Sequence, residues 1–235
     1  MNNAKDIAFA SAKGITKNFI KRVPIFGTVV DIYQEYAALL TQRKFKRLED
    51  FYRALNEEVQ NININKDYIR KEDFLDVFER TARYVVNERC EKKRLLFKNI
   101  LLHSVSVDNC SYDKTESYMR LLEQLNLLSI NIIAILHNPI EYNKKNGMII
   151  ADLPAVHVGP GMHYILKYDF VEQLQLLLKL KSKDDILEEL YFLEVNRIIY
   201  SGVKNRVIET NVNPVQVLEN SLTKKGEDFF SFLVN

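Results

Sequence analysis

The spacing of apolar side chains predicts helices along most of the chain. Residues 3–22 and the adjoining Val23 carry one apolar stripe, formed by Ala8, Ala12, Ile15, Phe19 and Val23. This spacing matches the period of an amphipathic helix. Pro24 disfavours helical geometry at the residue before it and is itself suited to the first turn of a new helix. The pattern therefore predicts a helix ending near Val23, followed by a long second helix over about residues 25–59.

Further helices are predicted as far as about residue 139, with polar loops between them. Except for the alternative at Lys71, each start is marked by a residue whose side chain can accept a hydrogen bond from a free backbone N–H group. In chain order, the predicted starts are Asp67 or Lys71, Asn87, the acidic capping box "DKTE" at residues 113–116, and Ser129. The helix that starts at Asn87 is expected to run to about Val105.

Residues 140–167 differ from what precedes them. They hold three of the seven glycines and two of the five prolines, which predicts an irregular linker or loop. A helix is expected over about residues 168–180, and "SKDD" at 182–185 is expected to start another. Next, "NRIIYSGVKNRVIETN" predicts a two-stranded hairpin turning at residues 201–205. A last short helix is predicted from Thr223.

The order of elements at the end of the chain resembles that of bacterial winged-helix domains. The phrase "ILEELYFLEVNRIIY" leads from a predicted helix into the predicted hairpin, which is followed by a closing "LTKKGEDFFSF" helix. The fold class expected is mainly α, with a helical bundle followed by a small winged-helix-like α/β domain. We predict a helical domain in residues 1–139, the linker in 140–167, and the winged-helix-like domain in 168–235.

Composition limits the classes of function. The chain is 47% hydrophobic and 27% charged, which is typical of a folded globular protein. Its net charge of +2 is close to neutral, so binding to nucleic acid or to a membrane would need a local patch. Two cysteines in 235 residues are too few for a disulfide scaffold and fit a reducing compartment. With no signal peptide or membrane span expected, a cytoplasmic protein is predicted.

Candidate catalytic and metal-binding residues do not form a recognised pattern. His157 and His163 lie in the glycine-rich region without the paired spacing of a zinc site. Cys90 and His103 fall on one predicted helix, roughly 20 Å apart at about 1.5 Å per residue, too far to act as a pair. No glycine-rich phosphate-binding motif is present. We therefore predict no catalytic, cofactor-binding or metal-binding residues, no cofactor and no small-molecule substrate.

Basic side chains are the candidate contacts to a partner or to nucleic acid. They are Lys13, Lys17, Lys21, Arg43, Lys44, Lys92, Arg94, Lys204 and Arg206. The predicted recognition helix of the winged-helix-like domain is acidic, however, and acids are repelled by phosphates. A protein partner or self-association is thus expected, with nucleic acid as the alternative. The basic, amphipathic first helix also suits a membrane surface, which is the less favoured partner because packing on the core explains the same pattern.

Three phrases in order resemble the bacterial abortive-infection alpha family or a close neighbour of it. They are "EKKRLLFKNIL" at 91–101, "MRLLEQLNLLSINIIAIL" at 119–136, and the two C-terminal phrases quoted above. The second phrase fits the form LxxLxxxxxxIL and the closing phrase fits LTxxGxxF, while the first resembles EKxxxFxxIL with one additional residue before the phenylalanine. The resemblance implies a role in antiviral defence against phage and supplies no catalytic residues.

The expected function is therefore that of a non-enzymatic helical protein of a bacterial phage-defence or stress system, acting through protein contacts. One alternative is a nucleic-acid-binding regulator that uses the basic helices and the wing. Another is a helical nuclease or toxin effector. The HEPN ribonucleases, which place an arginine a few residues before a histidine on one helix, do not share the spacing seen around His103 and His137.

Overall fold

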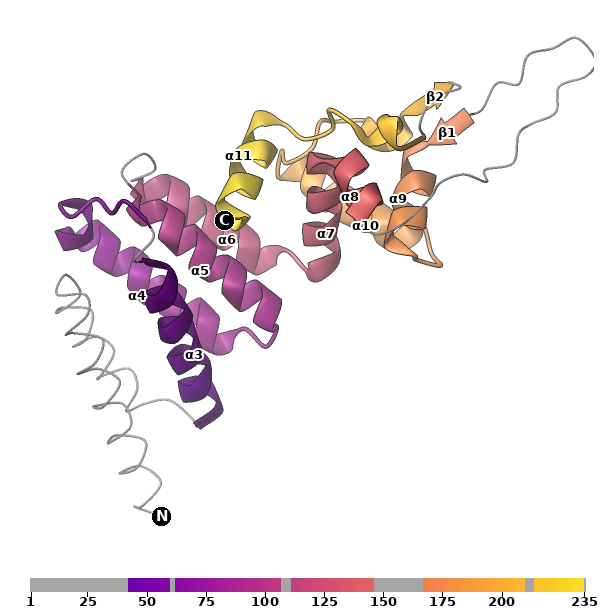
Figure 1. Cartoon of the computed structure of the whole chain (residues 1–235). Helices are drawn as coiled ribbons and strands as arrows, with labels where there is room; N and C mark the ends of the chain where they lie inside the picture. The colour runs from indigo at the N-terminus through magenta and orange to yellow at the C-terminus, as the bar shows by residue number, and fades with distance from the viewer. Residues whose placement is uncertain (1–41, 60–61, 107–110, 146–166, 210–213, 235) are drawn as a thin grey trace, which may run out of the picture. The chain divides into compact units, whose positions relative to one another are not determined.

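A computed structural model describes residues 42–59, 62–106, 111–145, 167–209 and 214–234 (Figure 1). This part of the chain is mainly α-helical, with one short two-stranded sheet, so the mainly α prediction is confirmed. The chain packs as two compact units, one comprising Met1–Gln124 with Phe232–Asn235 and the other Leu125–Ser231. The unit boundary thus follows Gln124, whereas the predicted domain boundary was near residue 139.

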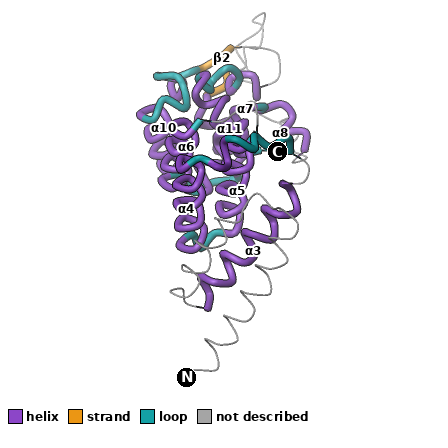
Figure 2. The backbone as a smooth tube through the Cα atoms, turned by 90° about the vertical axis from the view of Figure 1, so that its left-hand side faces the viewer, coloured by secondary structure: helices purple, strands orange, loops and turns teal. Residues whose placement is uncertain are grey.

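The described part of the first unit is built from four helices, seen at the indigo-to-magenta end of Figure 1 and in side view in Figure 2. They are α3 (Gln42–Val59), α4 (Glu72–Asn87), α5 (Glu91–Val105) and α6 (Tyr112–Gln124). Their apolar stripes meet in a core that includes Leu48, Phe78, Ile100 and Leu122, each at most 1% exposed. A short 3₁₀ helix, Tyr68–Arg70, precedes α4.

Two helix starts in this unit differ from the prediction. Asn87 is the last residue of α4, and its Nδ2 donates to the backbone oxygen of Arg83 at 2.9 Å. The next helix, α5, begins after a break of three residues, with Cys90 at its N-cap position. Asn87 was expected to cap this helix because its side chain suits that position, but the same amide serves equally well at the end of a helix.

The acidic capping box predicted at residues 113–116 is also absent from α6, which is described in full. The helix starts at Tyr112. Ser111 caps it, because its Oγ accepts a hydrogen bond from the free N–H group of Lys114 at 3.4 Å. Glu116 instead forms ion pairs with Arg80 of α4 and Arg120 of α6. Two guanidinium groups attract its carboxylate more strongly than a backbone N–H group does.

The second unit contains α7 (Leu127–His137), α8 (Pro139–Lys145), α9 (Phe170–Leu178), α10 (Asp184–Val195) and most of α11 (Lys224–Leu233). The start predicted at Ser129 is two residues late, because Asn126 caps α7 by accepting from the N–H of Ser129 at 2.9 Å. The irregular linker was predicted from residue 140, but residues 140–145 belong to the helix α8, so the prediction is wrong for these residues. Residues 146–166 lie outside the described part.

The two strands pair in a way that the sequence did not predict. Strand β1 (Lys167–Asp169) is antiparallel to β2 (Val207–Glu209), with Tyr168 opposite Ile208. Residues Val203–Asn205 form a 3₁₀ helix after Gly202, whose φ is +80°. The predicted local hairpin is therefore wrong, since β2 pairs with a strand that lies before α9 in the chain. Strands so far apart in the chain are brought together by tertiary packing, so no turn residues between them mark the pairing in the sequence.

The start of α11 explains the "LTKKG" phrase. Thr223 accepts from the N–H of Gly226 at 3.1 Å and donates its own backbone N–H to the oxygen of Ile198 at 2.9 Å. A Cβ atom at position 226 would fall well inside contact distance of that same oxygen. The glycine is thus required by close backbone approach, and the predicted start at Thr223 is confirmed.

Candidate functional site

Helix α10 presents a face to solvent that is not part of the core. Ile186, Leu190 and Leu193 point inward and are fully buried. At about 100° per residue, the positions opposite them are Asp184, Glu188, Tyr191 and Val195. All four are exposed. We call these residues, with Asp185 and Leu187 at the borders, the α10 face.

The C-terminal half of the α10 face is apolar. Tyr191 and Val195 are each 62% exposed, and Leu187, one turn before Tyr191 at the border with the acidic half, is 39% exposed. Single exposed apolar residues are ordinary on protein surfaces, whereas several on one face of a helix indicate a contact surface. Tyrosine is also among the residues enriched at the centres of protein interfaces.

The turn after α10 holds this apolar half in place. Glu194 accepts hydrogen bonds from the Oγ of Ser201 at 2.5 Å and the N–H of Gly202 at 3.2 Å, and pairs with Lys204 at 3.4 Å. The Ser201 bond lowers the pKa of the Glu194 carboxyl, assisted by Gly202 and Lys204, against a smaller opposing effect of burial. The Lys204 ammonium lies 5.7 Å from the centre of the Tyr191 ring. These contacts give the ring a defined setting before any partner arrives.

The N-terminal half of the α10 face is acidic. Two neighbouring charges are paired elsewhere: Lys183 with Glu172 of α9 at 2.7 Å, and Glu189 with Asn126 and Ser129 of α7. Among the described residues, no side chain or backbone group pairs with the carboxylates of Asp184, Asp185 and Glu188. The α10 face therefore changes along its axis from three free carboxylates to an apolar end.

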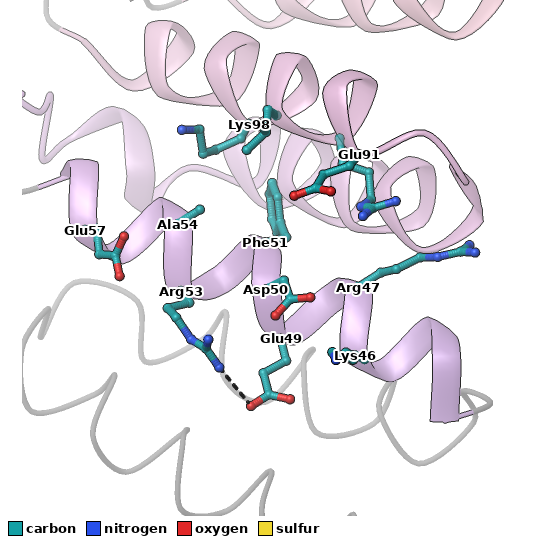
Figure 3. A pocket seen from close by; sticks show the side chains of 12 residues that line it. Lys46, Arg47, Glu49, Asp50, Phe51, Arg53, Ala54, Glu57, Glu91 and Lys98 are labelled. Atoms are coloured by element: carbon teal, nitrogen blue, oxygen red, sulfur yellow. Dashed lines mark hydrogen bonds and ion pairs between the residues drawn. The ribbon is translucent and has the colours of Figure 1, made fainter.

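A groove of about 670 Å³ lies between α3 and α5 in the first unit (Figure 3). Phe51, Ala54 and Leu95 contribute its apolar lining, and charges of both signs surround them. Several of its cations are already engaged: Arg53 with Glu49, Lys98 with Glu58, and Arg47 with the backbone oxygen of Val86. The groove is accordingly poor as an anion-binding site.

The predicted contact residues are dispersed. Lys13, Lys17 and Lys21 lie outside the described residues. Arg94 donates to the backbone oxygens of Glu88 and Arg89. Arg206 donates to the backbone oxygens of Val217 and Glu219, at 3.2 and 2.6 Å.

Among the other predicted cations, Lys44 donates to the Oδ1 of Asn87 at 2.7 Å, and Lys204 is paired with Glu194. Arg43 and Lys92 are exposed, and neither has a polar partner within the described part of the chain. A nucleic-acid footprint made of these residues stays a prediction, with most of its described cations serving intramolecular contacts.

The histidines of the described part stabilise the fold. His103 Nε2 lies 3.1 Å from the backbone oxygen of Val234, and His137 pairs with Glu227. Cys90 is a free, half-buried thiol. Within the described ranges, no group of three or more histidine, cysteine or acidic side chains could hold a metal ion. His157 and His163 lie outside these ranges.

No family model, curated protein or solved structure matches this chain. Among the described helices, none is by itself long and apolar enough to cross a membrane, although α6 and α7 meet that test as a pair. The acids of α10 are recognisable in the sequence, whereas its exposed apolar end was not predicted. A helical projection would have revealed it, because Tyr191 and Val195 fall opposite the buried Leu193.

Proposed function

We propose that this protein is a non-enzymatic helical protein that acts through protein contacts made by the α10 face. The observation that carries the proposal is the exposure of Tyr191 and Val195 on the same helix as three carboxylates that have no partner among the described residues. The neighbouring turn keeps the surface ordered, which lowers the entropic cost of binding.

The second unit is proposed to be winged-helix-like in its order of elements. The succession β1, α9, α10, β2, with an antiparallel β1–β2 pair, supports this reading. In such a fold α10 would be the recognition helix. Its carboxylates would meet phosphates unfavourably, so a protein surface is the better match for it than DNA.

The proposed setting is bacterial defence against phage, on the strength of the abortive-infection-like phrases in the sequence. A nucleic-acid-binding regulator draws less support, since Lys204 and Arg206 are engaged within the fold. A nuclease or toxin effector draws less support as well, because both described histidines have structural partners.

Photo-crosslinking tests the α10 face directly. A photoreactive phenylalanine analogue at position 191 of the full chain, irradiated in cells, should give a discrete adduct heavier than the 27.5 kDa chain. The same analogue at Leu176, a residue of α9 that is 43% exposed, is the matched control and should give none. Equal labelling at the two positions, or no adduct at 191 before or after phage challenge, would contradict the proposal.

Phage plating tests the setting. Cells that express the chain should reduce plaque formation, and the double variant Tyr191→Ala, Val195→Ala should lose that reduction while Leu176→Ala retains it. Full protection by the double variant would show that defence against phage does not depend on the α10 face.

A further inference from the structure

We propose that the α10 face binds one helix of a partner protein, lying antiparallel to α10. Its contact stripe is apolar in the N-terminal half and cationic in the C-terminal half. This inference rests on the proposed function and names the chemistry of its partner.

Charge complementarity sets the cationic half. The first turns of α10 contain three acids, Asp184, Asp185 and Glu188. Their carboxylates have no hydrogen-bond or ion-pair partner within the described residues. Carboxylates near a helix N-terminus suit the helix dipole, which accounts for their being in the helix. It does not account for the apolar residues that continue the same face. A lysine or arginine row opposite these acids would pair with them and steer association.

Apolar exposure sets the other half. From Asp184 to Tyr191 the axial rise is roughly 10 Å, at about 1.5 Å per residue. The acidic and apolar ends therefore face different turns of the same partner helix. Leu187, Tyr191 and Val195 form a short ridge that apolar residues at i, i+3 and i+4 of that helix can bracket. The Lys204 ammonium near the Tyr191 ring discourages a cation at this end.

Helix polarity sets the direction. In an antiparallel pair, the C-terminal end of the partner lies beside the N-terminal end of α10, so the two dipoles attract. Cations in the last turns of the partner also suit its own dipole. In the antiparallel direction, the cations of the partner lie beside the acids of α10 and also at the C-terminal end of their own helix, where the helix dipole favours them.

The occupant that we assign is a separate protein, and a second copy of this chain is the alternative that the tests distinguish.

Peptide binding to the full chain tests the inference. The probe is a labelled helical peptide of about 15 residues, with Leu and Ile on one stripe in its first half and Lys on that stripe in its second half. One comparison peptide reverses the two halves, and another has Glu in place of Lys. Fluorescence anisotropy at low and high salt should show the first peptide binding about tenfold or more tightly than either comparison.

Variants assign the effect to the α10 face. The triple change Asp184→Asn, Asp185→Asn, Glu188→Gln should weaken binding about tenfold at low salt and remove most of the salt dependence. Its control alters three exposed acids at the start of α4, Glu72→Gln, Asp73→Asn and Asp76→Asn, and should leave binding unchanged. Tyr191→Ala with Val195→Ala should weaken binding at both salt concentrations, whereas Leu176→Ala should not.

Equal affinity for the Lys and Glu peptides would overturn the cationic partner, and tighter binding of the reversed peptide would overturn the antiparallel direction. A dimer of the chain that the Tyr191→Ala, Val195→Ala variant converts to monomer would overturn the separate partner in favour of a second copy. None of these results would remove a crosslink from position 191, so failure of this inference is distinguishable from failure of the proposed function.

Discussion

The Nδ1 atom of His137, in the last turn of α7, lies 2.6 Å from the Oε2 atom of Glu227, in the first turn of α11. The centre of the same imidazole ring lies 4.4 Å from that of Phe230. The two partners are 90 residues apart in the chain. This histidine therefore fixes the start of α11 on α7 and belongs to the framework of the second unit.

We expect His137→Ala to lower the free energy of unfolding by about 1 kcal/mol, because it removes the ring contact and the paired carboxylate contact. Glu227→Gln should cost less, about 0.5 kcal/mol, since both side chains are nearly half exposed. Urea unfolding of the two single variants and the double variant would measure the coupling. A coupling of zero would show that the pair contributes nothing in solution.

Lys98 of α5 is only 4% exposed and pairs with Glu58 of α3. Changing Glu58 to Gln leaves the buried ammonium without its carboxylate and should cost about 2 kcal/mol. Lys98→Met should cost less, about 1 kcal/mol, because the stem stays packed and no buried charge remains. Chemical denaturation would rank them. The exposed pair Arg53–Glu49 is the control, and Arg53→Gln should change stability by less than about 0.5 kcal/mol.

Glu88 gives a pH-dependent contribution to stability. Partial burial raises the pKa of its carboxyl, but hydrogen bonds from the N–H of Cys90 at 2.7 Å and from Lys93, 3.2 Å away, outweigh it and leave the pKa below the ordinary 4.5. A lowered folded-state pKa means that the stabilisation is present above about pH 4.5 and is lost as the pH falls through the folded-state value.

Glu88→Gln should accordingly cost about 1 kcal/mol at pH 7 and progressively less as the carboxyl of the parent protein becomes protonated. Unfolding by urea between pH 7 and pH 3, for the parent and the variant, gives the difference directly. A difference independent of pH would contradict this role. Glu91→Gln, at an exposed position nearby, is the matched control.

Gly226 and Gly202 should respond to alanine for different reasons. At Gly226 an added Cβ meets the backbone oxygen of Ile198, so Gly226→Ala should cost about 3 kcal/mol and displace the start of α11. At Gly202 the space is open but φ is +80°, so Gly202→Ala should cost only about 1 kcal/mol. Thermal unfolding of the two variants would test this order, and equal costs would argue against close approach at position 226.

Much of the helical framework could be predicted because it depends on local pattern. The apolar spacing on α4 and α11 follows the helical period, and a start such as Thr223 depends on a side chain that bonds to its own turn. Single side chains suited to more than one position were less informative. Asn87 fits a helix start and a helix end equally well. It ends α4 because the backbone becomes extended at Glu88.

The sequence by itself determined the mainly α class, the closing "LTKKG" turn and the acidic character of α10, since each follows from residue type and near-neighbour spacing. Tertiary structure decided that β2 pairs with β1, that Lys98 is buried against Glu58, and that most described candidate cations are engaged internally. It also decided that Tyr191 and Val195 remain outside the core. These outcomes depend on which faces meet after folding, and long-range packing leaves no periodic signal along the chain.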